Sequence, residues 1–364
     1  MRKKIIFSCL MVFFTFVVCL SLCEIYLRFF EHDRAQTFVR LGDRIYPLSG
    51  LADSRHYTFD PKTGYALIPN IHDEKQFITT DQHGFRTTGK AIDPDRESII
   101  FVGDSTVFGW GVRDEAAFPY LLAHQDSLNN FNIINMGVPS YSIGHIVQVL
   151  EEKVPLYKPK IVFVAILWPW KPFDGYSSST AWKKVDFDFY KKTIPSRTQY
   201  ASYESLKRRL MPKTFFYLRD VYYKIKFKDQ IRDNLTRPGI RDFNIPEEDE
   251  KKLALEHVRL LKGAAASLEA KGVQVIFYIH PYQYTIFHKD YQTLGKTGRE
   301  MMRKQLNALY PGDFLKCKFS GEPLFIDGCH MSELGHQQYA NYFLGIIHRT
   351  LTLHKLEDYG IPLL

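Results

Sequence analysis

The first residue whose surroundings suggest chemistry is Ser105, in the run Gly103-Asp104-Ser105 that follows an apolar segment. A serine between a strand and a helix can present its hydroxyl, and its own backbone N–H, to a substrate carbonyl. The alternative is a turn in which these residues only cap a helix. No Gly-Lys-Ser or Gly-Lys-Thr follows, so a phosphate-binding loop is excluded.

A second candidate group lies near the carboxyl terminus, where Asp327 precedes His330 by three residues. At this spacing the carboxylate can accept from one imidazole nitrogen while the other nitrogen faces a nucleophile, which is what a general base needs. The alternative is a metal site of Asp327, His330 and His336, but no fourth ligand is apparent. We therefore expect no metal and no cofactor. His280 contacts substrate or, as we favour, is structural, and the position of Cys329 beside the base argues against a thiol nucleophile.

The elements between these groups are predicted from hydrophobic periodicity. Short β-rich runs occur at 98–102, 132–136, 161–167, 273–279 and 324–326, with helical patterns between them. The clearest helix spans 247–271, between Pro246 and Gly272, and its apolar residues recur at spacings of four and three: Ala254, Val258, Leu261, Ala265 and Leu268. Such alternation predicts a three-layer α/β/α sandwich with a five-stranded, mostly parallel sheet. Ligands bind at the carboxyl ends of such strands, where Ser105 and His330 stand.

In order along the chain, these blocks resemble the SGNH or GDSL hydrolase superfamily from Arg86 to Tyr342. The matching runs are Gly103-Asp104-Ser105, Asn135-Met136-Gly137 and Asp327-x-x-His330. The amino-terminal region is similar to the membrane-anchored branch, in which a span ending in Glu-x-x-x-Arg precedes a Gly-Phe-Arg turn; here these are Glu24, Arg28 and Gly84-Phe85-Arg86. The resemblance implies a flavodoxin-like SGNH fold.

The resemblance also implies roles for single residues. Ser105 corresponds to the nucleophile, His330 to the general base and Asp327 to its orienting acid. The backbone N–H groups of Ser105 and Gly137 correspond to two donors to the oxyanion of the transition state.

One block departs from the family pattern. After the third strand the family has an Asn that is the third oxyanion donor, whereas this chain reads Trp168-Pro169-Trp170-Lys171, with Trp168 at that position. Loss of one such donor costs about 100- to 1000-fold in rate. The indole N–H of Trp168 or Trp170, or the ammonium of Lys171, can replace it; alternatively these side chains only wall the pocket.

The amino terminus predicts a membrane anchor. Arg2, Lys3 and Lys4 precede an uncharged apolar run from Ile5 to Cys23, whose 19 residues would span about 28 Å as a helix. The basic residues favour a cytoplasmic amino terminus and a single span, which places the rest outside the cytoplasm. We favour a bacterial periplasm, and a eukaryotic endomembrane is the alternative. A cleaved signal peptide and a lipoprotein site at Cys23 are the alternatives.

Length and composition bound the domain organisation and the class of protein. With 45% hydrophobic residues, the 364-residue chain can bury a full core, and disorder is excluded. We expect an anchor helix over 1–31, an irregular or β-containing lead-in over 32–96, and a hydrolase domain over 97–354 with a basic, aromatic insertion at 172–246. Five Cys without a Cys-x-x-Cys pair exclude a disulfide scaffold and structural zinc. Cys317 and Cys329 either form a disulfide or stay thiols.

The net charge is +8, and the stretch from Pro172 to Asn244, with 16 Lys and Arg against 8 Asp and Glu, accounts for all of it. Behind a membrane anchor this pattern favours an anionic lipid headgroup or an acidic glycan over nucleic acid. The alternative is an ordinary solvated cap.

The leading hypothesis is an extracytoplasmic serine esterase that hydrolyses an O-acyl ester on a glycan or lipid. The second is an O-acyltransferase that passes the same acyl group to a cell-surface polysaccharide in a site that disfavours water. The third is a degenerate, non-catalytic binding protein that lost efficient chemistry with the missing Asn. Oligomeric state is not predicted.

Overall fold

The computed structural model describes residues 2–30, 38–41, 44–47, 56–60, 63–74, 77–139, 141–166, 221–222, 225–226, 247–282, 296–318, 324–326 and 329–358. Nearly all of the predicted insertion, 172–246, lies outside these ranges. So do four of the candidate site residues: Trp168, Trp170, Lys171 and Asp327.

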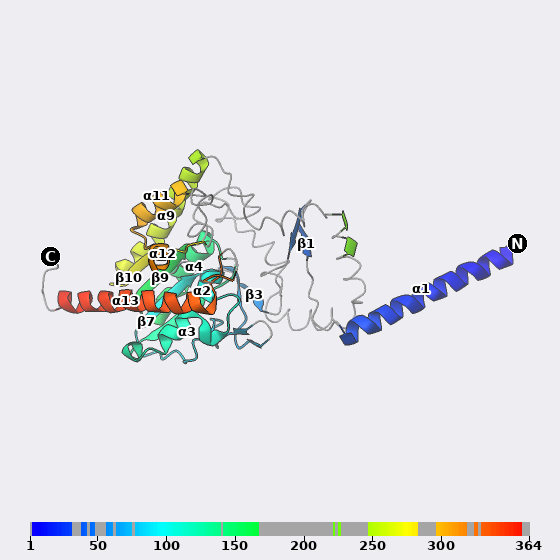
Figure 1. Cartoon of the computed structure of the whole chain (residues 1–364), viewed down its shortest axis with the longest axis horizontal. Coiled ribbons are helices and arrows are strands. Elements are labelled where there is room, and N and C mark those ends of the chain that lie inside the picture. Colours follow the sequence, from blue (N-terminus) through cyan, green and yellow to red (C-terminus); the bar gives the residue numbers. More distant parts are fainter. Residues whose placement is uncertain are drawn as a thin grey trace. The chain divides into compact units, whose positions relative to one another are not determined.

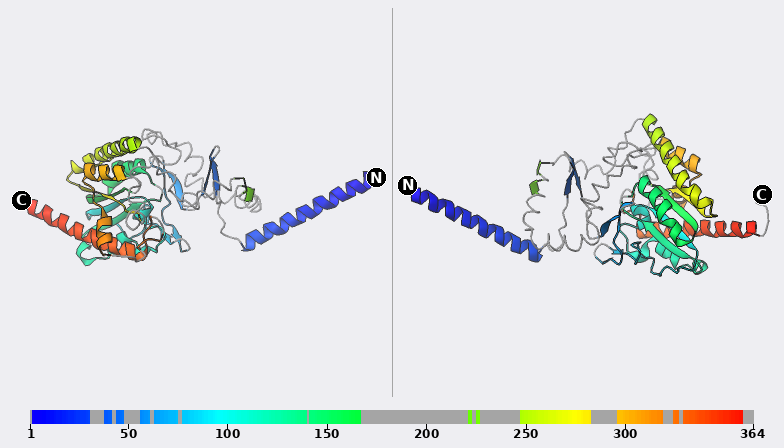
Figure 2. Two further views of the ribbon diagram at one scale, coloured as in Figure 1. Left: turned by 45° about the horizontal axis from the view of Figure 1, so that its top comes forward. Right: turned by 180° about the vertical axis from the view of Figure 1, so that it is seen from behind.

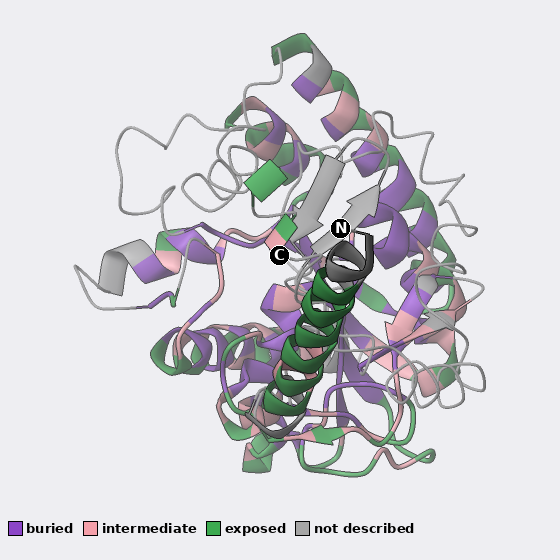
Figure 3. Cartoon of the chain, turned by 90° about the vertical axis from the view of Figure 1, so that its right-hand side faces the viewer, coloured by how far each residue is buried: buried purple, intermediate pink, exposed green. Residues whose placement is uncertain are grey.

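The chain forms two compact units, and the first comprises Met1–Arg55 and Pro195–Arg241. Its described elements include helix α1, Arg2–Phe30, and an antiparallel pair of strands, β1 Phe38–Leu41 and β2 Arg44–Pro47 (Figure 1). α1 contains neither Gly nor Pro, and most of its described side chains are exposed (Figure 3). Over the described residues, the structure contains no helix with both the length and the apolar character that crossing a membrane requires.

The second unit comprises His56–Ile194 and Asp242–Leu364, so its start divides the predicted lead-in. It opens with two antiparallel hairpins: β3 Tyr57–Asp60 with β4 Gly64–Leu67, and β5 His72–Asp73 with β6 Ile78–Thr79. The first hairpin is tied to the loop after β8, because the buried hydroxyl of Tyr65 donates to the carbonyl of Pro139 at 3.0 Å.

Four parallel strands form the central sheet in the order β10-β9-β7-β8 (Figure 1). They are β7 Ser98–Gly103, β8 Asn132–Gly137, β9 Pro159–Ile166 and β10 Gln274–Ile279. All six residues of β7 and of β8 are buried. This is why continuous apolar runs, without strict alternation, marked these strands in the sequence.

The prediction of a fifth strand at 324–326 is wrong. Phe325 pairs with Met331 in an isolated antiparallel bridge, and no sheet strand is formed there among the described residues. The Ser332 N–H donates to the Leu324 carbonyl at 2.9 Å, so the backbone groups of this segment are used inside its own loop.

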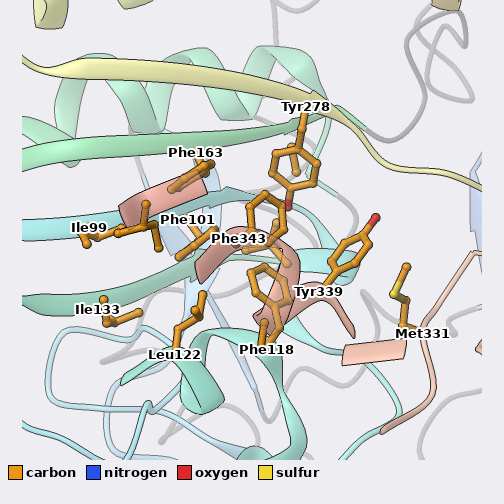
Figure 4. Packing of buried hydrophobic residues seen from close by; sticks show 14 of the residues in the cluster. Ile99, Phe101, Phe118, Leu122, Ile133, Phe163, Tyr278, Met331, Tyr339 and Phe343 are labelled. Carbon is orange, nitrogen blue, oxygen red and sulfur yellow. The ribbon is translucent and has the colours of Figure 1, made fainter. Parts of the chain in front are cut away.

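Helices cover both faces of the sheet. Residues of β7 and β9, Ile99, Phe101 and Phe163, join Phe118 of α3 and Phe343 of α13 in one buried cluster (Figure 4). The helices α4 and α9 contact β7 and β10 and contribute no residue to this cluster, so they cover the opposite face (Figure 2). The unit therefore has an α/β architecture with a parallel core.

The α-helices of this unit include α2 Ser105–Phe108, α3 Phe118–Ala123, α4 Ile143–Glu152, α9 Glu247–Glu269, α11 Lys296–Leu306, α12 Pro311–Lys318 and α13 Glu333–Asp358. Its short 3-10 helices are η1 Asp114–Ala116, η2 Asp126–Leu128 and η3 Val154–Tyr157. The apolar residues that predicted α9 are all buried. α9 ends at Glu269, two residues before the predicted end, because the Gly272 N–H turns back onto the Glu269 carbonyl with Gly272 at φ 79°.

The strand order has a switch point between β7 and β9. The chain leaves β7 towards β8 on one side of the sheet and leaves β9 towards β10 on the other. At such a switch point the connections diverge, and ligands bind outside the carboxyl ends of the two strands. Ser105 stands directly after the Asp104 that follows β7.

Candidate active site

The site is defined by a contact between Ser105 and His330, which lie 225 residues apart in the sequence. Ser105 Oγ is 2.8 Å from His330 Nε2, and both residues are partly exposed to solvent. A hydroxyl at this distance donates its proton to a neutral imidazole, which makes its oxygen more nucleophilic. The structure thus brings together the two candidate residues on which the predicted chemistry depends.

Ser105 is held by a tight connection from β7 into α2. A Cβ at Gly103 would lie 2.4 Å from Val107 Cγ2 and 2.8 Å from Ala165 Cβ, so a side chain there would displace the turn. Asp104 caps α2, accepting from the Thr106 N–H at 3.0 Å and from the Thr106 hydroxyl at 2.8 Å. Ser105 is therefore the first residue of a one-turn helix with a fixed start.

The turn after α2 is held by a buried arginine. The Arg86 guanidinium donates to the carbonyls of Phe108 at 2.8 Å, Val112 at 2.7 Å and Gly109, and it pairs with Asp114 Oδ1 at 2.8 Å. Burial lowers the pKa of Arg86, and the charge of Asp114 opposes that shift. In the sequence, Arg86 is matched only as part of a Gly-Phe-Arg turn. Its partners are the Phe77 carbonyl, at 2.9 Å, and groups of 108–114, which no local pattern reveals.

His330 is presented by a closed loop. The Ile326 N–H donates to the His330 carbonyl at 2.9 Å, next to the bridge between Phe325 and Met331. One residue before it, Cys329 is a thiol whose Sγ lies 3.7 Å from His330 Nδ1. The side chain of Cys317, with which a disulfide was one of two alternatives, lies outside the described residues.

A buried carboxyl group lies near this pair. Burial raises the pKa of Asp104, while the hydrogen bonds from Thr106 and the attraction of a charged His330 lower it. The predicted orienting acid, Asp327, lies outside the described residues, and its role stays a prediction.

The N–H of Gly137, predicted as an oxyanion donor, has a partner within the protein. It donates to Asn135 Oδ1 at 3.0 Å. The Asn135 amide in turn donates to the carbonyls of Val107 at 3.1 Å and Phe108 at 3.3 Å. A Cβ at Gly137 would lie 2.3 Å from the Phe108 backbone nitrogen. Packing therefore explains the glycine at position 137, because a residue without a side chain lets α2 approach β8 closely.

His336, considered in the sequence as a metal ligand, is buried with its ring stacked on Phe118. Its Nδ1 accepts from the Phe118 N–H at 3.3 Å, and burial lowers its pKa to about 3. Within the ranges that the structure describes, no group of three or more His, Cys, Asp or Glu side chains is arranged to hold a metal ion.

Neither a family model nor a curated protein matches this chain. Among solved structures, it is similar to a lipolytic protein of the G-D-S-L family from Desulfitobacterium hafniense, with 14% identity and a TM-score of 0.35 over 68% of this chain and 97% of that one. It is also similar to Axe2, an acetylxylan esterase from Geobacillus stearothermophilus, with 15% identity and a TM-score of 0.35 over 68% of this chain and 92% of that one. The functional proposal for this chain rests on its own residues.

Proposed function

We propose that the protein is a serine esterase in which Ser105 is the nucleophile and His330 the general base. The observation that carries this proposal is the 2.8 Å contact between Ser105 Oγ and His330 Nε2 at the carboxyl end of β7. A second Ser–His contact, Ser127 Oγ to His348 Nε2 at 2.8 Å, joins two exposed side chains far from that edge. Its position argues against chemistry there and makes it a matched control.

The reaction proceeds through an acyl-enzyme. Ser105 Oγ attacks the ester carbonyl carbon as its proton passes to His330 Nε2, and the imidazolium then protonates the leaving alkoxide. Water next attacks the acyl-enzyme, giving its proton to His330, which returns it to Ser105 Oγ. The acid leaves and the free enzyme is restored.

The oxyanion requires donors. Ser105 begins α2, so its N–H has no acceptor within the helix and is the first donor in this proposal. We further propose that Asp327 orients His330, and that Trp168, Trp170 or Lys171 supplies the donor that the family takes from Asn. Because Gly137 donates to Asn135, its N–H is left out of the set.

The same proposal includes a membrane location with the second unit outside the cytoplasm. The large apolar side chains of α1, among them Phe13, Phe14 and Phe16, are exposed. Arg2, Lys3 and Lys4 at its start match the rule that positive residues stay in the cytoplasm. Sedimentation with membranes after carbonate washing, together with protease accessibility from the outer side, tests this location. Release by carbonate would argue against an anchor.

Activity is tested on the full-length protein with p-nitrophenyl acetate and a fluorophosphonate probe. Wild type and Ser127→Ala should turn over the ester and be labelled, whereas Ser105→Ala should do neither, and His330→Ala should lose at least about 1000-fold in kcat. A folded wild type that neither turns over nor labels would contradict the proposal and favour a binding role. Transfer of the acyl group to an added sugar in preference to water would replace hydrolysis by acyl transfer.

A further inference from the structure

The residue that follows β10, His280, connects three parts of the second unit. Its backbone N–H donates to the carbonyl of Ile166, the last residue of β9, at 2.9 Å. Its imidazole is 1% exposed, with Nε2 2.8 Å from the Cys329 carbonyl oxygen and Nδ1 3.0 Å from the Tyr339 hydroxyl. It therefore links the sheet, the loop of His330 and helix α13.

The partners of His280 decide where its proton lies. A carbonyl oxygen only accepts, so Nε2 must carry the hydrogen. In the neutral ring Nδ1 then accepts, and the Tyr339 O–H donates to it. Burial holds the pKa of Tyr339 well above its ordinary value, so this hydroxyl keeps its proton. Tyr339 thus selects the imidazole tautomer that can hold Cys329.

The carbonyl of Cys329 belongs to the peptide bond that joins Cys329 to His330. The next peptide group is held as well, because the His330 carbonyl accepts from the Ile326 N–H at 2.9 Å. Peptide groups are planar, so anchoring both groups that flank one Cα restricts the φ and ψ of that residue. With both peptide groups held, the Cα–Cβ bond of His330, from which the imidazole extends to Ser105, is held as well.

We propose that His280 is a positioning residue for the general base, with Tyr339 fixing its tautomer; this inference rests on the proposed function. The chain from the Tyr339 hydroxyl through His280 to the Cys329 carbonyl is called the His280 bridge. It acts through the main chain of the loop that carries His330.

Two pairs of variants in the full-length protein test the bridge. Tyr339→Phe removes the donor and keeps the ring. Its matched control is Tyr278→Phe, because Tyr278 lies in the same buried cluster (Figure 4) and its hydroxyl has no partner among the described residues. His280→Gln places an amide N–H near the position of Nε2, whereas His280→Asn is too short to reach the Cys329 carbonyl.

A misplaced general base lowers kcat more than substrate binding, since small displacements cost rate steeply. With p-nitrophenyl acetate we expect Tyr339→Phe and His280→Asn to lose about 10- to 100-fold in kcat, with KM changed less than about 3-fold. His280→Gln should recover most of the loss, and Tyr278→Phe should behave as wild type. If folded Tyr339→Phe and His280→Asn keep wild-type kcat, the bridge has no positioning role. A rise in KM with kcat unchanged would also overturn the positioning role of the bridge.

A second readout separates this inference from the esterase proposal. With ¹⁵N-labelled histidine, NMR of the wild type should show His280 as the Nε2–H tautomer, assigned by the loss of its signals in His280→Gln. Tyr339→Phe should change that tautomer ratio, and Tyr278→Phe should not. An Nδ1–H tautomer in wild type would refute the bridge. If the tautomer is as expected but wild type shows no turnover or labelling, the esterase proposal fails instead, and with it the role of His280 in catalysis.

Discussion

The guanidinium of Arg86 and the carboxylate of Asp114 form a buried ion pair, with Nε 2.8 Å from Oδ1 and side-chain exposures of 1% and 13%. The other guanidinium nitrogens donate to the main-chain carbonyls of Phe77, of Phe108 at the end of α2, and of the turn that follows α2. The Arg86 guanidinium thus satisfies several carbonyl acceptors at once, next to the helix that begins with Ser105.

Arg86→Met should therefore destabilise the protein and lower esterase activity together. Removing one partner of a buried pair leaves the other charge without compensation, which costs about 3–5 kcal/mol of unfolding free energy. The control is Arg113→Met, because Arg113 pairs with Glu333 at 3.3 Å between exposed side chains, and surface pairs contribute about 0–1 kcal/mol. Urea unfolding measures the free energy of unfolding of both variants. Equal losses of that free energy in the two variants would contradict the role of Arg86.

Gly137→Ala should disturb α2. The added Cβ would meet the Phe108 backbone nitrogen at 2.3 Å, so strand or helix must shift, which should cost about 1–3 kcal/mol and lower the rate of fluorophosphonate labelling. Gly263→Ala provides the contrast, because a Cβ there meets nothing within 4 Å in the middle of α9. It should stabilise the protein by about 0.5–1 kcal/mol. Thermal unfolding and labelling rates test both, and a neutral Gly137→Ala would show that the contact is easily relieved.

Stability should fall on acidification below pH 6.5. Burial lowers the pKa of His145 to about 4 and of His336 to about 3, from 6.5 in the unfolded chain. Between the folded and unfolded pKa values the unfolded state binds more protons than the folded state. The contribution of the two histidines to the free energy of unfolding is therefore complete above pH 6.5. It is lost as the pH falls, by up to about 1.4 kcal/mol per pH unit for each histidine.

The contribution of His336 can be isolated by urea unfolding at pH 7.0 and 5.0. His336→Asn retains an oxygen that can accept from Phe118 but does not titrate, so its stability should depend on pH less steeply than that of wild type. The exposed His348→Asn should keep the wild-type slope. Identical slopes for wild type and His336→Asn would refute the assignment.

Cys329→Ser should leave activity within about 3-fold of wild type. The thiol lies beside His330, but the group that His280 holds is the main-chain carbonyl of Cys329, which serine retains. Because rate follows the position of the base, keeping that carbonyl keeps the base in place. Ester turnover with and without a thiol-alkylating reagent checks this. Complete loss of labelling in Cys329→Ser would indicate a catalytic thiol instead.

Several features followed from the sequence alone. The strands β7 to β10 and helix α9 were predictable because their apolar residues are periodic or continuous over a few turns or strand lengths. Ser105 was identifiable because it follows a predicted strand, and His330 because it lies three residues after Asp327. Both signals are local, so no tertiary information was required.

Other features were settled only by the tertiary structure. Whether 324–326 joined the sheet depended on the bridge from Phe325 to Met331, and the engagement of the Gly137 N–H depended on how Asn135 packs against α2. Arg86 and His280 were not recognised as positioning residues, because the partners of their side chains lie 9 to 28 and 49 to 59 residues away. Residue type and short spacing determine which elements form and which side chains can react. Hydrogen bonds between groups distant in sequence exist only once the chain has packed, so they alone decide how those side chains are aimed.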